Sequence, residues 1–198
     1  MPINAKPAPW IVVFDGQSLN LVPGALTTYC YKVMSGRGVP WRITAKSGIP
    51  WIGNPTPWSD LSDDAATRTH PLAKAATQSV LVMCGGQSDL WADDTAATLY
   101  ADGVTYANAA RAAGFDWIIG TTITANSVNT AGQNTERQAH NVLLLADASN
   151  AFDDVVDLAA NANLEDYNTY TSDGVHWTGA ATTIVASLLD PYLDAVLV

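Results

Sequence analysis

The stretch Trp10-Ile11-Val12-Val13-Phe14-Asp15-Gly16-Gln17-Ser18-Leu19-Asn20 decides how the rest of the chain is interpreted. Its first five residues form a continuous apolar run, which predicts a strand buried on both faces. Gly16 permits a sharp turn, and Pro23 then suits the first turn of a helix. A serine between a buried strand and a helix lies where α/β folds bind ligands. Taken alone, the same pattern is also typical of a serine that caps a helix.

The chain has the length and composition of one globular domain covering residues 1–198, with 48% hydrophobic and 14% charged residues. No apolar run reaches the length of a membrane span. The first nine residues lack the apolar core of a signal peptide. We therefore expect a cytoplasmic protein or a component of a larger assembly such as a virus particle, and the sequence does not choose between them.

The net charge of −10 excludes one class of partner. Polyanion binding needs a basic patch, and the nine Lys and Arg residues form no cluster. We therefore expect neither nucleic acid nor an anionic membrane as a partner. The two cysteines, Cys30 and Cys84, are too few for a disulfide scaffold and are expected to be small buried residues.

Strands and helices alternate along the chain. Strands are expected at 10–14, 41–45, 79–84, 117–120 and 152–158, and helices at 22–35, 71–77, 95–113, 136–146 and 178–189. Because the strands are continuous apolar runs, the pattern predicts an α/β fold, a three-layer α/β/α sandwich around a parallel sheet of about five strands. Pro191 is expected to break or kink the last helix. The regions 51–69 and 160–175 are expected to be loops, the first being long enough for a lid, a binding wall or a surface insertion.

A second polar block, Ser172-Asp173-Gly174-Val175-His176-Trp177-Thr178, precedes the last predicted helix. Asp173 and His176 are close enough in sequence for their side chains to meet in a tight turn. A carboxylate in that position fixes the tautomer of an imidazole, which can then act as a general base. The same spacing also occurs in surface turns that an aspartate caps.

The order of these blocks resembles the SGNH (GDSL-type) hydrolase family over essentially the whole chain, and so implies a flavodoxin-like fold. Gly16-Gln17-Ser18-Leu19 resembles the nucleophile block, with Gln17 where the family usually has aspartate. Gly48 matches the glycine of the second block, and Gly86-Gln87-Ser88-Asp89 resembles the third block, Gly-x-Asn-Asp. Asp173 and His176 match the final block.

The resemblance leans toward the sialate O-acetylesterase-like and carbohydrate esterase branches, whose blocks read Gly-Gln-Ser-Asn and Gly-Glu-Ser-Asp. It implies Ser18 as nucleophile, His176 as base and Asp173 as the residue that orients it. It also implies an oxyanion hole of the Ser18 and Gly48 backbone N–H groups. Because Ser88 replaces the family's asparagine, the third donor is Gln87 or Ser88, or the two backbone donors act alone. The α/β-hydrolase design is disfavoured, because its Gly-x-Ser-x-Gly elbow would need glycine at Asn20.

The expected activity is hydrolysis of small acyl esters, such as acetyl esters of a carbohydrate, with no metal or cofactor. A lipid or aryl esterase is one alternative, and a carbohydrate-binding or adhesion module without turnover is another. Trp51, Trp58 and Trp177 are candidates for stacking on a sugar, with core packing as the other interpretation.

Several other polar residues are expected to have structural roles. His70 and His140 are interpreted as surface or packing residues. Asp89, Asp93 and Asp94 are better explained as acids before a helix than as a cation site. The loop residues Asn126, Asn129 and Asn134 are given no role.

Overall fold

The computed structural model describes residues 10–16, 28–44, 65, 69–74 and 76–197 of the 198-residue chain. Its strands are β1 (Trp10–Gly16), β2 (Trp41–Ile43), β3 (Gln78–Cys84), β4 (Trp117–Thr121) and β5 (Asp154–Val156). Its helices are α1 (Tyr29–Met34), the 3₁₀ helix η3 (His70–Lys74), α3 (Gln87–Trp91), α4 (Ala96–Ala113), α5 (Ala131–Ala146), α6 (Ala162–Glu165), α7 (Tyr167–Tyr170) and α8 (Gly179–Val196). Within these ranges no helix combines the length and hydropathy that a membrane crossing requires.

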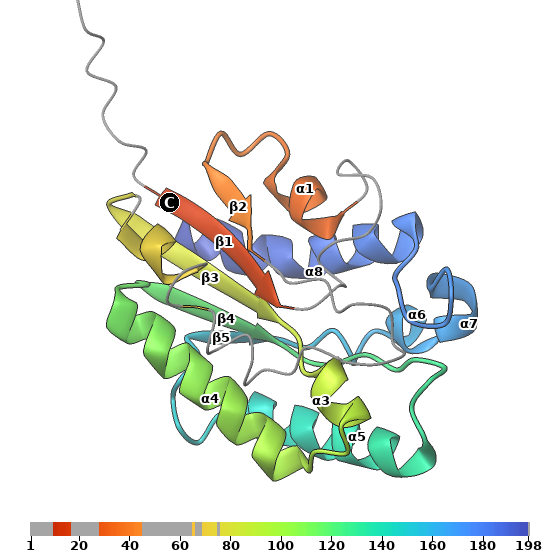
Figure 1. The fold of residues 1–198 in the computed structure, drawn as a ribbon. Helices are drawn as coiled ribbons and strands as arrows, with labels where there is room; N and C mark the ends of the chain where they lie inside the picture. The colour runs from red at the N-terminus through yellow and green to blue at the C-terminus, as the bar shows by residue number, and fades with distance from the viewer. Residues whose placement is uncertain (1–9, 17–27, 45–64, 66–68, 75, 198) are drawn as a thin grey trace, which may run out of the picture.

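The strands form one parallel sheet of five strands in the order β2-β1-β3-β4-β5. Helices α1 and α8 cover one face, and α4 and α5 cover the other (Figure 1). This is the three-layer α/β/α sandwich that the alternation of strands and helices predicts. All five strands run the same way, so their carboxyl ends meet at one edge of the sheet.

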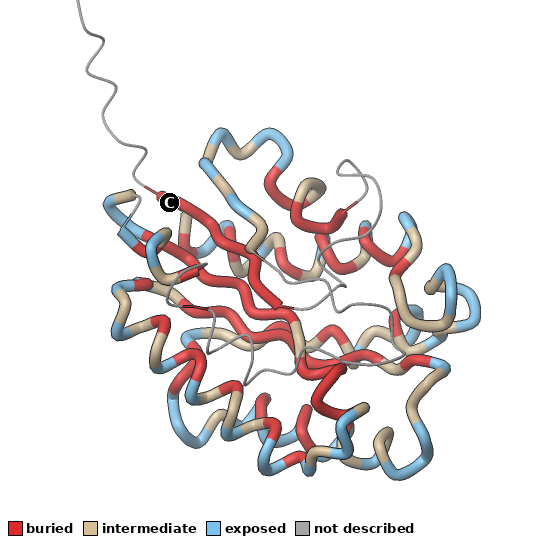
Figure 2. The backbone as a smooth tube through the Cα atoms, viewed as in Figure 1, coloured by how far each residue is buried: buried red, intermediate tan, exposed pale blue. Residues whose placement is uncertain are grey.

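The apolar run of β1 is continuous because both of its faces are buried. Val12 and Phe14 lie in the core under α1 and α8, whereas Ile11 and Val13 lie in the core under α4. The burial map shows the same central strands buried along their length (Figure 2). Burying each such side chain contributes about 1.5–3 kcal/mol, so the two cores hold the sheet from both sides.

Two predicted helix boundaries are wrong because of local capping. A continuous helix over 22–35 is excluded, because Thr28 is extended (φ −67°, ψ 147°) and caps α1 by accepting from the N–H of Tyr31. Pro23 lies outside the described residues. Helix α5 begins at Ala131, ahead of the predicted 136, because Thr130 and Gln133 form a reciprocal capping box.

The last helix runs through Pro191 to Val196 and does not end near 189. Leu193 and Val196, which follow the proline, are buried in the core under α8, and this packing offsets the lost backbone hydrogen bond. The region predicted as a loop at 160–175 contains the short helices α6 and α7. Helix α3, immediately after β3, was also not predicted from the sequence.

Candidate active site

Asp173 and His176 form a hydrogen-bonded pair in the turn between α7 and α8. The distance from His176 Nδ1 to Asp173 Oδ2 is 2.7 Å. An ionised carboxylate only accepts hydrogen bonds, so Nδ1 carries the proton and Nε2 is left as the basic nitrogen. The pair therefore has the tautomer that general-base catalysis at Nε2 requires.

The other carboxylate oxygen of Asp173 shapes the backbone of the turn. Asp173 Oδ1 accepts from the backbone N–H of Val175 at 3.0 Å and of His176 at 2.8 Å. Burial alone would raise the pKa of Asp173, but the hydrogen bonds from His176 and Val175 outweigh it and lower that pKa. Asp173 is therefore ionised wherever the imidazole is needed as a base.

The turn is closed by backbone contacts on both sides of the pair. Ser172 donates its N–H to the carbonyl of His176 at 2.8 Å, and Thr171 pairs with Trp177 in an antiparallel bridge. Gly174 has φ +86°, a conformation that favours glycine. Thr178 then caps α8, so the histidine directly precedes a long helix that is packed in the core.

Trp177 lies in the core, so of the two interpretations of this residue the structure favours packing. Its side chain is 2% exposed, and its ring meets that of Tyr29 edge-to-face at 6.0 Å. A ring enclosed in this way has no free face for a sugar. The other two tryptophans of that prediction, Trp51 and Trp58, lie outside the described residues.

The predicted nucleophile Ser18 and the predicted oxyanion glycine Gly48 also lie outside the described residues. The structure does describe the end of the strand that leads to Ser18. Gly16, the last residue of β1, is paired with Cys84, the last residue of β3. The third sequence block, Gly86-Gln87-Ser88-Asp89, follows directly, so the first and third blocks emerge from neighbouring strands at the same edge.

The third block opens a short helix. Gly86 is left-handed (φ +93°), and α3 starts at Gln87. Gln87 and Ser88 are both buried, at 5% and 4% exposed. The side-chain amide of Gln87 donates from Nε2 to Asn129 Oδ1 at 2.7 Å, and the indole N–H of Trp91 donates to the same oxygen at 3.0 Å.

A buried carboxylate closes β1 beside the first block. Asp15 is fully buried, and its Oδ1 accepts from the N–H of Gly16 at 2.9 Å. Its Oδ2 accepts from the hydroxyl of Thr69 at 2.7 Å and from the hydroxyl of Tyr106 on α4. Asp15 thereby joins the strand end to both the segment before η3 and helix α4.

Residues 122–130, here called the β4–α5 loop, lie beside both the turn and α3, and no role was predicted for them from the sequence. The N–H of Ser127 donates to the carbonyl of Gly174 at 2.9 Å. Asn129 contacts Gln87 and Trp91, as described above. The only sequence signal for this loop is its place at the carboxyl end of a buried strand, where α/β folds collect functional residues.

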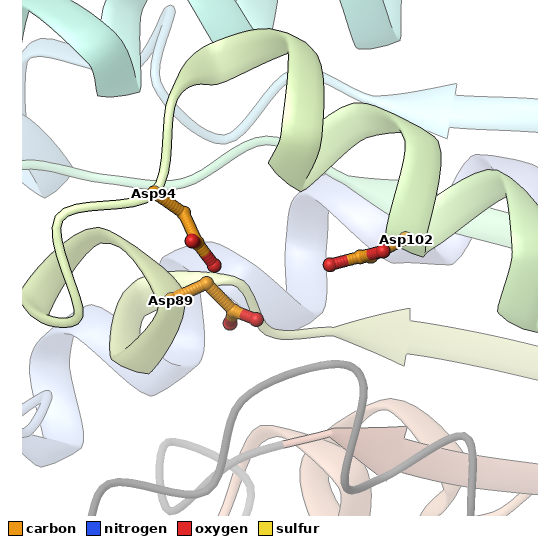
Figure 3. A group of neighbouring side chains, drawn as sticks. All are labelled: Asp89, Asp94 and Asp102. Atoms are coloured by element: carbon orange, nitrogen blue, oxygen red, sulfur yellow. The ribbon is translucent and has the colours of Figure 1, made fainter.

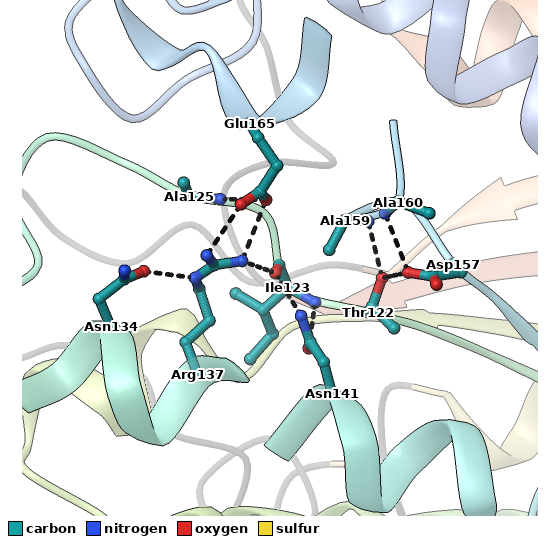
Figure 4. Close-up of polar contacts among 10 residues, drawn as sticks. All are labelled: Thr122, Ile123, Ala125, Asn134, Arg137, Asn141, Asp157, Ala159, Ala160 and Glu165. Carbon is teal, nitrogen blue, oxygen red and sulfur yellow. Dashed lines mark hydrogen bonds and ion pairs between the residues drawn. The ribbon is translucent and has the colours of Figure 1, made fainter. Parts of the chain in front are cut away.

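A polar network fixes the start of the β4–α5 loop (Figure 4). Arg137, whose side chain is 2% exposed, pairs with both oxygens of Glu165 at 3.0 and 2.9 Å and donates to the carbonyl of Ile123 at 2.8 Å. Glu165 also accepts from the N–H of Ala125 at 2.9 Å, and Asn141 exchanges two hydrogen bonds with Ile123. The loop thus starts from a backbone that α5 and α6 hold in place.

Three carboxylates gather beside α3 (Figure 3). The facing oxygens of Asp89, Asp94 and Asp102 lie within 4.8 Å of one another, a spacing at which hard cations are bound. Burial, followed by the neighbouring Asp94, raises the pKa of Asp102, so a proton there would relieve the same repulsion. The sequence analysis interpreted Asp89, Asp93 and Asp94 as acids before a helix; of these, Asp93 lies apart from the group and accepts from Gln133 at 2.9 Å.

The other two histidines and the two cysteines pack inside the fold. His70 stacks on Tyr106 with ring centroids 6.3 Å apart. His140 is 4% exposed and lines a small cavity between β3, β4 and α5. Cys30 and Cys84 are buried thiols, as expected from the sequence, and burial raises the pKa of both.

Comparison with known proteins identifies the fold. No protein-family model matches the chain, and no curated protein matches it. Among solved structures it is similar to a G-D-S-L family lipolytic protein from Veillonella parvula, with a TM-score of 0.73 and 14% identity over 91% of this chain and 96% of that one. The chain therefore has the fold of the GDSL (SGNH) hydrolases, as its sequence blocks predicted.

Two further similar structures are esterases. One is a carbohydrate esterase of family 3 from Talaromyces cellulolyticus, with a TM-score of 0.70 and 13% identity over 94% of this chain and 97% of that one. The other is a variant of an acetyl-xylooligosaccharide esterase from Geobacillus stearmophilus, with a TM-score of 0.69 and 14% identity over 95% and 94%.

Proposed function

We propose that the protein is a serine esterase that uses Ser18, His176 and Asp173. The observation that carries the proposal is the 2.7 Å bond between Asp173 and His176, in a turn whose Gly174 carbonyl accepts from Ser127 in the loop after β4. In the sequence, Ser18 comes two residues after Gly16, the last residue of β1. A strand-end serine and an oriented imidazole are the two components that activate a nucleophile.

The reaction follows from the tautomer of the pair. Ser18 Oγ attacks the ester carbonyl and its proton passes to His176 Nε2, while Asp173 stabilises the imidazolium that forms. The tetrahedral intermediate collapses, and the leaving alcohol takes the proton from Nε2. Water then attacks the acyl-serine with the same assistance, which releases the acid and restores Ser18.

The proposed oxyanion hole consists of the backbone N–H groups of Ser18 and Gly48 with Gln87 or Ser88 as third donor. Loss of one such donor lowers kcat by about 10²–10³ in other serine hydrolases. For the substrate we propose small acyl esters, acetyl in particular, on a carbohydrate. The two esterases with the same fold support that class, because one is a carbohydrate esterase and the other an acetyl-xylooligosaccharide esterase.

The first test is intact-mass analysis after reaction with a fluorophosphonate probe. Wild type should gain one adduct, and the Ser18→Ala variant should gain none. An unlabelled, folded wild type would contradict the esterase and favour a carbohydrate-binding module without turnover. The second test is a series of p-nitrophenyl esters, in which a kcat/KM optimum at acetyl supports the proposed substrate and an optimum at long chains supports a lipid esterase.

A further inference from the structure

The turn that carries Asp173 and His176 rests against Ser127 in the β4–α5 loop. The N–H of Ser127 donates to the carbonyl of Gly174 at 2.9 Å. The two residues also pack closely, since a Cβ on Gly174 would lie 1.8 Å from Ser127 Oγ. Because Gly174 lies between Asp173 and His176 in the chain, the place of Ser127 bears directly on the place of the base.

Side chains bind the backbone of the loop on both sides of Ser127 (Figure 4). These bonds are Arg137 to the Ile123 carbonyl at 2.8 Å, the Ala125 N–H to Glu165 at 2.9 Å and the Thr130 N–H to Gln133 at 3.0 Å. They take the place of the strand or helix bonds that a loop lacks. The loop is thereby fixed to α5 and α6, and it can serve as a support for the turn.

Asn126 shapes the part of the loop that contains Ser127. Its Oδ1 accepts from the N–H of Val128 at 2.9 Å and from the N–H of Asn129 at 3.0 Å. Both partners are donors, so the atom that faces them must be the oxygen. The two bonds close an Asx turn around Ser127, whose own N–H donates to Gly174.

The nitrogen of the same side chain lowers stability. Asn126 is 8% exposed, and its Nδ2 is buried and finds no hydrogen-bond partner among the described residues. A buried donor without a partner is unfavourable, and a serine would close a similar turn without carrying one. Asn126 therefore contributes through Oδ1 alone, at a site where stability by itself does not favour it.

We propose that Asn126 is a positioning residue for the general base, because it holds Ser127 where Ser127 supports the turn of Asp173 and His176. The inference rests on the proposed esterase function and deepens it, since it adds a residue that acts on the base without touching it. The bond between Asp173 and His176 lies within the turn. Loss of the Asn126 oxygen should therefore shift the pair as a unit and leave its bond intact.

The kinetic test compares wild type with two variants by kcat and KM on p-nitrophenyl acetate. Asn126→Leu keeps the branched shape and accepts nothing, whereas Asn126→Asp keeps an oxygen that can close the same turn. A shift of the base by about 1 Å can cost 10²-fold, so we expect Asn126→Leu to lose about 10² in kcat with little change in KM. Asn126→Asp should retain kcat to within about tenfold. If Asn126→Leu does not fold, Asn126→Ala replaces it.

A double-mutant cycle tests whether Asn126 acts through the contact with Gly174. Gly174→Ala disturbs that contact from the other side. The double variant Asn126→Leu, Gly174→Ala should therefore lose about 10² in kcat, as each single variant does. A loss of about 10⁴, the product of two independent effects, would overturn the inference. Wild-type kcat in Asn126→Leu would overturn it too, as would equal losses in Asn126→Leu and Asn126→Asp.

Thr95→Val is the control for a general loss of stability. Thr95 Oγ1 accepts from the N–H of Thr98 at 3.2 Å and caps α4, so this variant also removes a bond from a side chain to the backbone. It should lower the melting temperature by about 2–4 °C and leave kcat unchanged. A fall of kcat in Thr95→Val equal to that in Asn126→Leu would assign the effect to stability and overturn the role of Asn126.

Hydrogen exchange, resolved by residue with NMR, tests the support of the turn without any substrate. The Ser127 N–H is protected by its bond to Gly174. It should exchange faster in Asn126→Leu than in wild type, and at the wild-type rate in Asn126→Asp and Thr95→Val. Unchanged exchange in Asn126→Leu would overturn the inference.

The two proposals fail in different ways. A wild type that neither hydrolyses the ester nor labels with fluorophosphonate overturns the esterase function and the role of Asn126 in catalysis, whatever the exchange rates. A wild type that does both, with unchanged Ser127 exchange or unchanged kcat in Asn126→Leu, overturns the role of Asn126 alone.

Discussion

Asp173 contacts His176 through both carboxylate oxygens: Oδ2 lies 2.7 Å from the ring nitrogen Nδ1, and Oδ1 accepts the backbone N–H at 2.8 Å. One side chain thus sets both the path of the turn and the tautomer of the imidazole. Asp173→Asn should lower kcat by about 10⁴, the loss seen in a serine-protease triad, because the amide no longer stabilises the required tautomer. Ester hydrolysis kinetics check this, and an active Asp173→Asn protein would contradict the triad. Ser172→Ala is the control, because within the described ranges Ser172 Oγ donates only to the His176 carbonyl, at 3.2 Å.

Because Gly174 lies against Ser127, adding a side chain at Gly174 should lower activity while the protein still folds. A Cβ on Gly174 would lie 1.8 Å from Ser127 Oγ, and the residue has φ +86°. Gly174→Ala must therefore move the turn, and misplacement of His176 by about 1 Å can cost 10²-fold in kcat. Gly179→Ala is the matched control, because a Cβ there meets nothing within 4 Å. Equal kcat in both variants would show that the contact does not position His176.

Breaking the ion pair of Arg137 and Glu165 should lower the free energy of unfolding, whereas breaking an exposed pair should change it little. The Arg137 side chain is 2% exposed, so Glu165→Gln leaves a buried charge without its counter-charge. We expect a loss of about 1–3 kcal/mol in the free energy of unfolding, measured by urea denaturation. Asp194→Asn removes a partner of Arg37 that is 68% exposed, and it should change the same quantity by less than about 1 kcal/mol. The prediction fails if the two variants are equally stable.

His140 predicts a loss of stability in acid. Burial lowers its pKa from 6.5 to about 4, so between these values the unfolded chain binds a proton that the folded chain does not. Stability should therefore fall as pH drops from about 6.5 to 4, by at most about 3 kcal/mol from this residue. The measurement is the free energy of unfolding against pH for wild type and His140→Gln. Parallel curves would show that His140 is not responsible.

Because the hydroxyl of Tyr106 is buried, its removal should lower the free energy of unfolding more than removal of a hydroxyl nearer the surface. Tyr106→Phe removes a donor from the fully buried Asp15, which should destabilise the protein by about 1–3 kcal/mol. Tyr100, which donates to Asp147 at 2.9 Å nearer the surface, provides the control Tyr100→Phe with a smaller loss. Thermal and urea unfolding of both variants test the difference, and equal losses would contradict it.

The fold was predictable because its signals are local and repeated. Apolar runs such as Trp10–Phe14 and Ser79–Cys84 are continuous, and only strands covered on both faces need that composition. The errors came where packing or capping overrides the local pattern. Pro191 lies inside α8 because Leu193 and Val196 are buried beyond it, and α5 starts early because Thr130 and Gln133 cap each other.

The sequence by itself determined the chemistry available at the site: a serine after the first strand, and an aspartate and a histidine close enough to meet in one turn. Asp173 and His176 meet because their spacing is local. Only the tertiary structure decided that Trp177 is a core residue and that Asn129 meets Gln87, 42 positions away. The reason is physical: contacts between loops depend on how strands are ordered in the sheet, and no local spacing in the chain encodes that order.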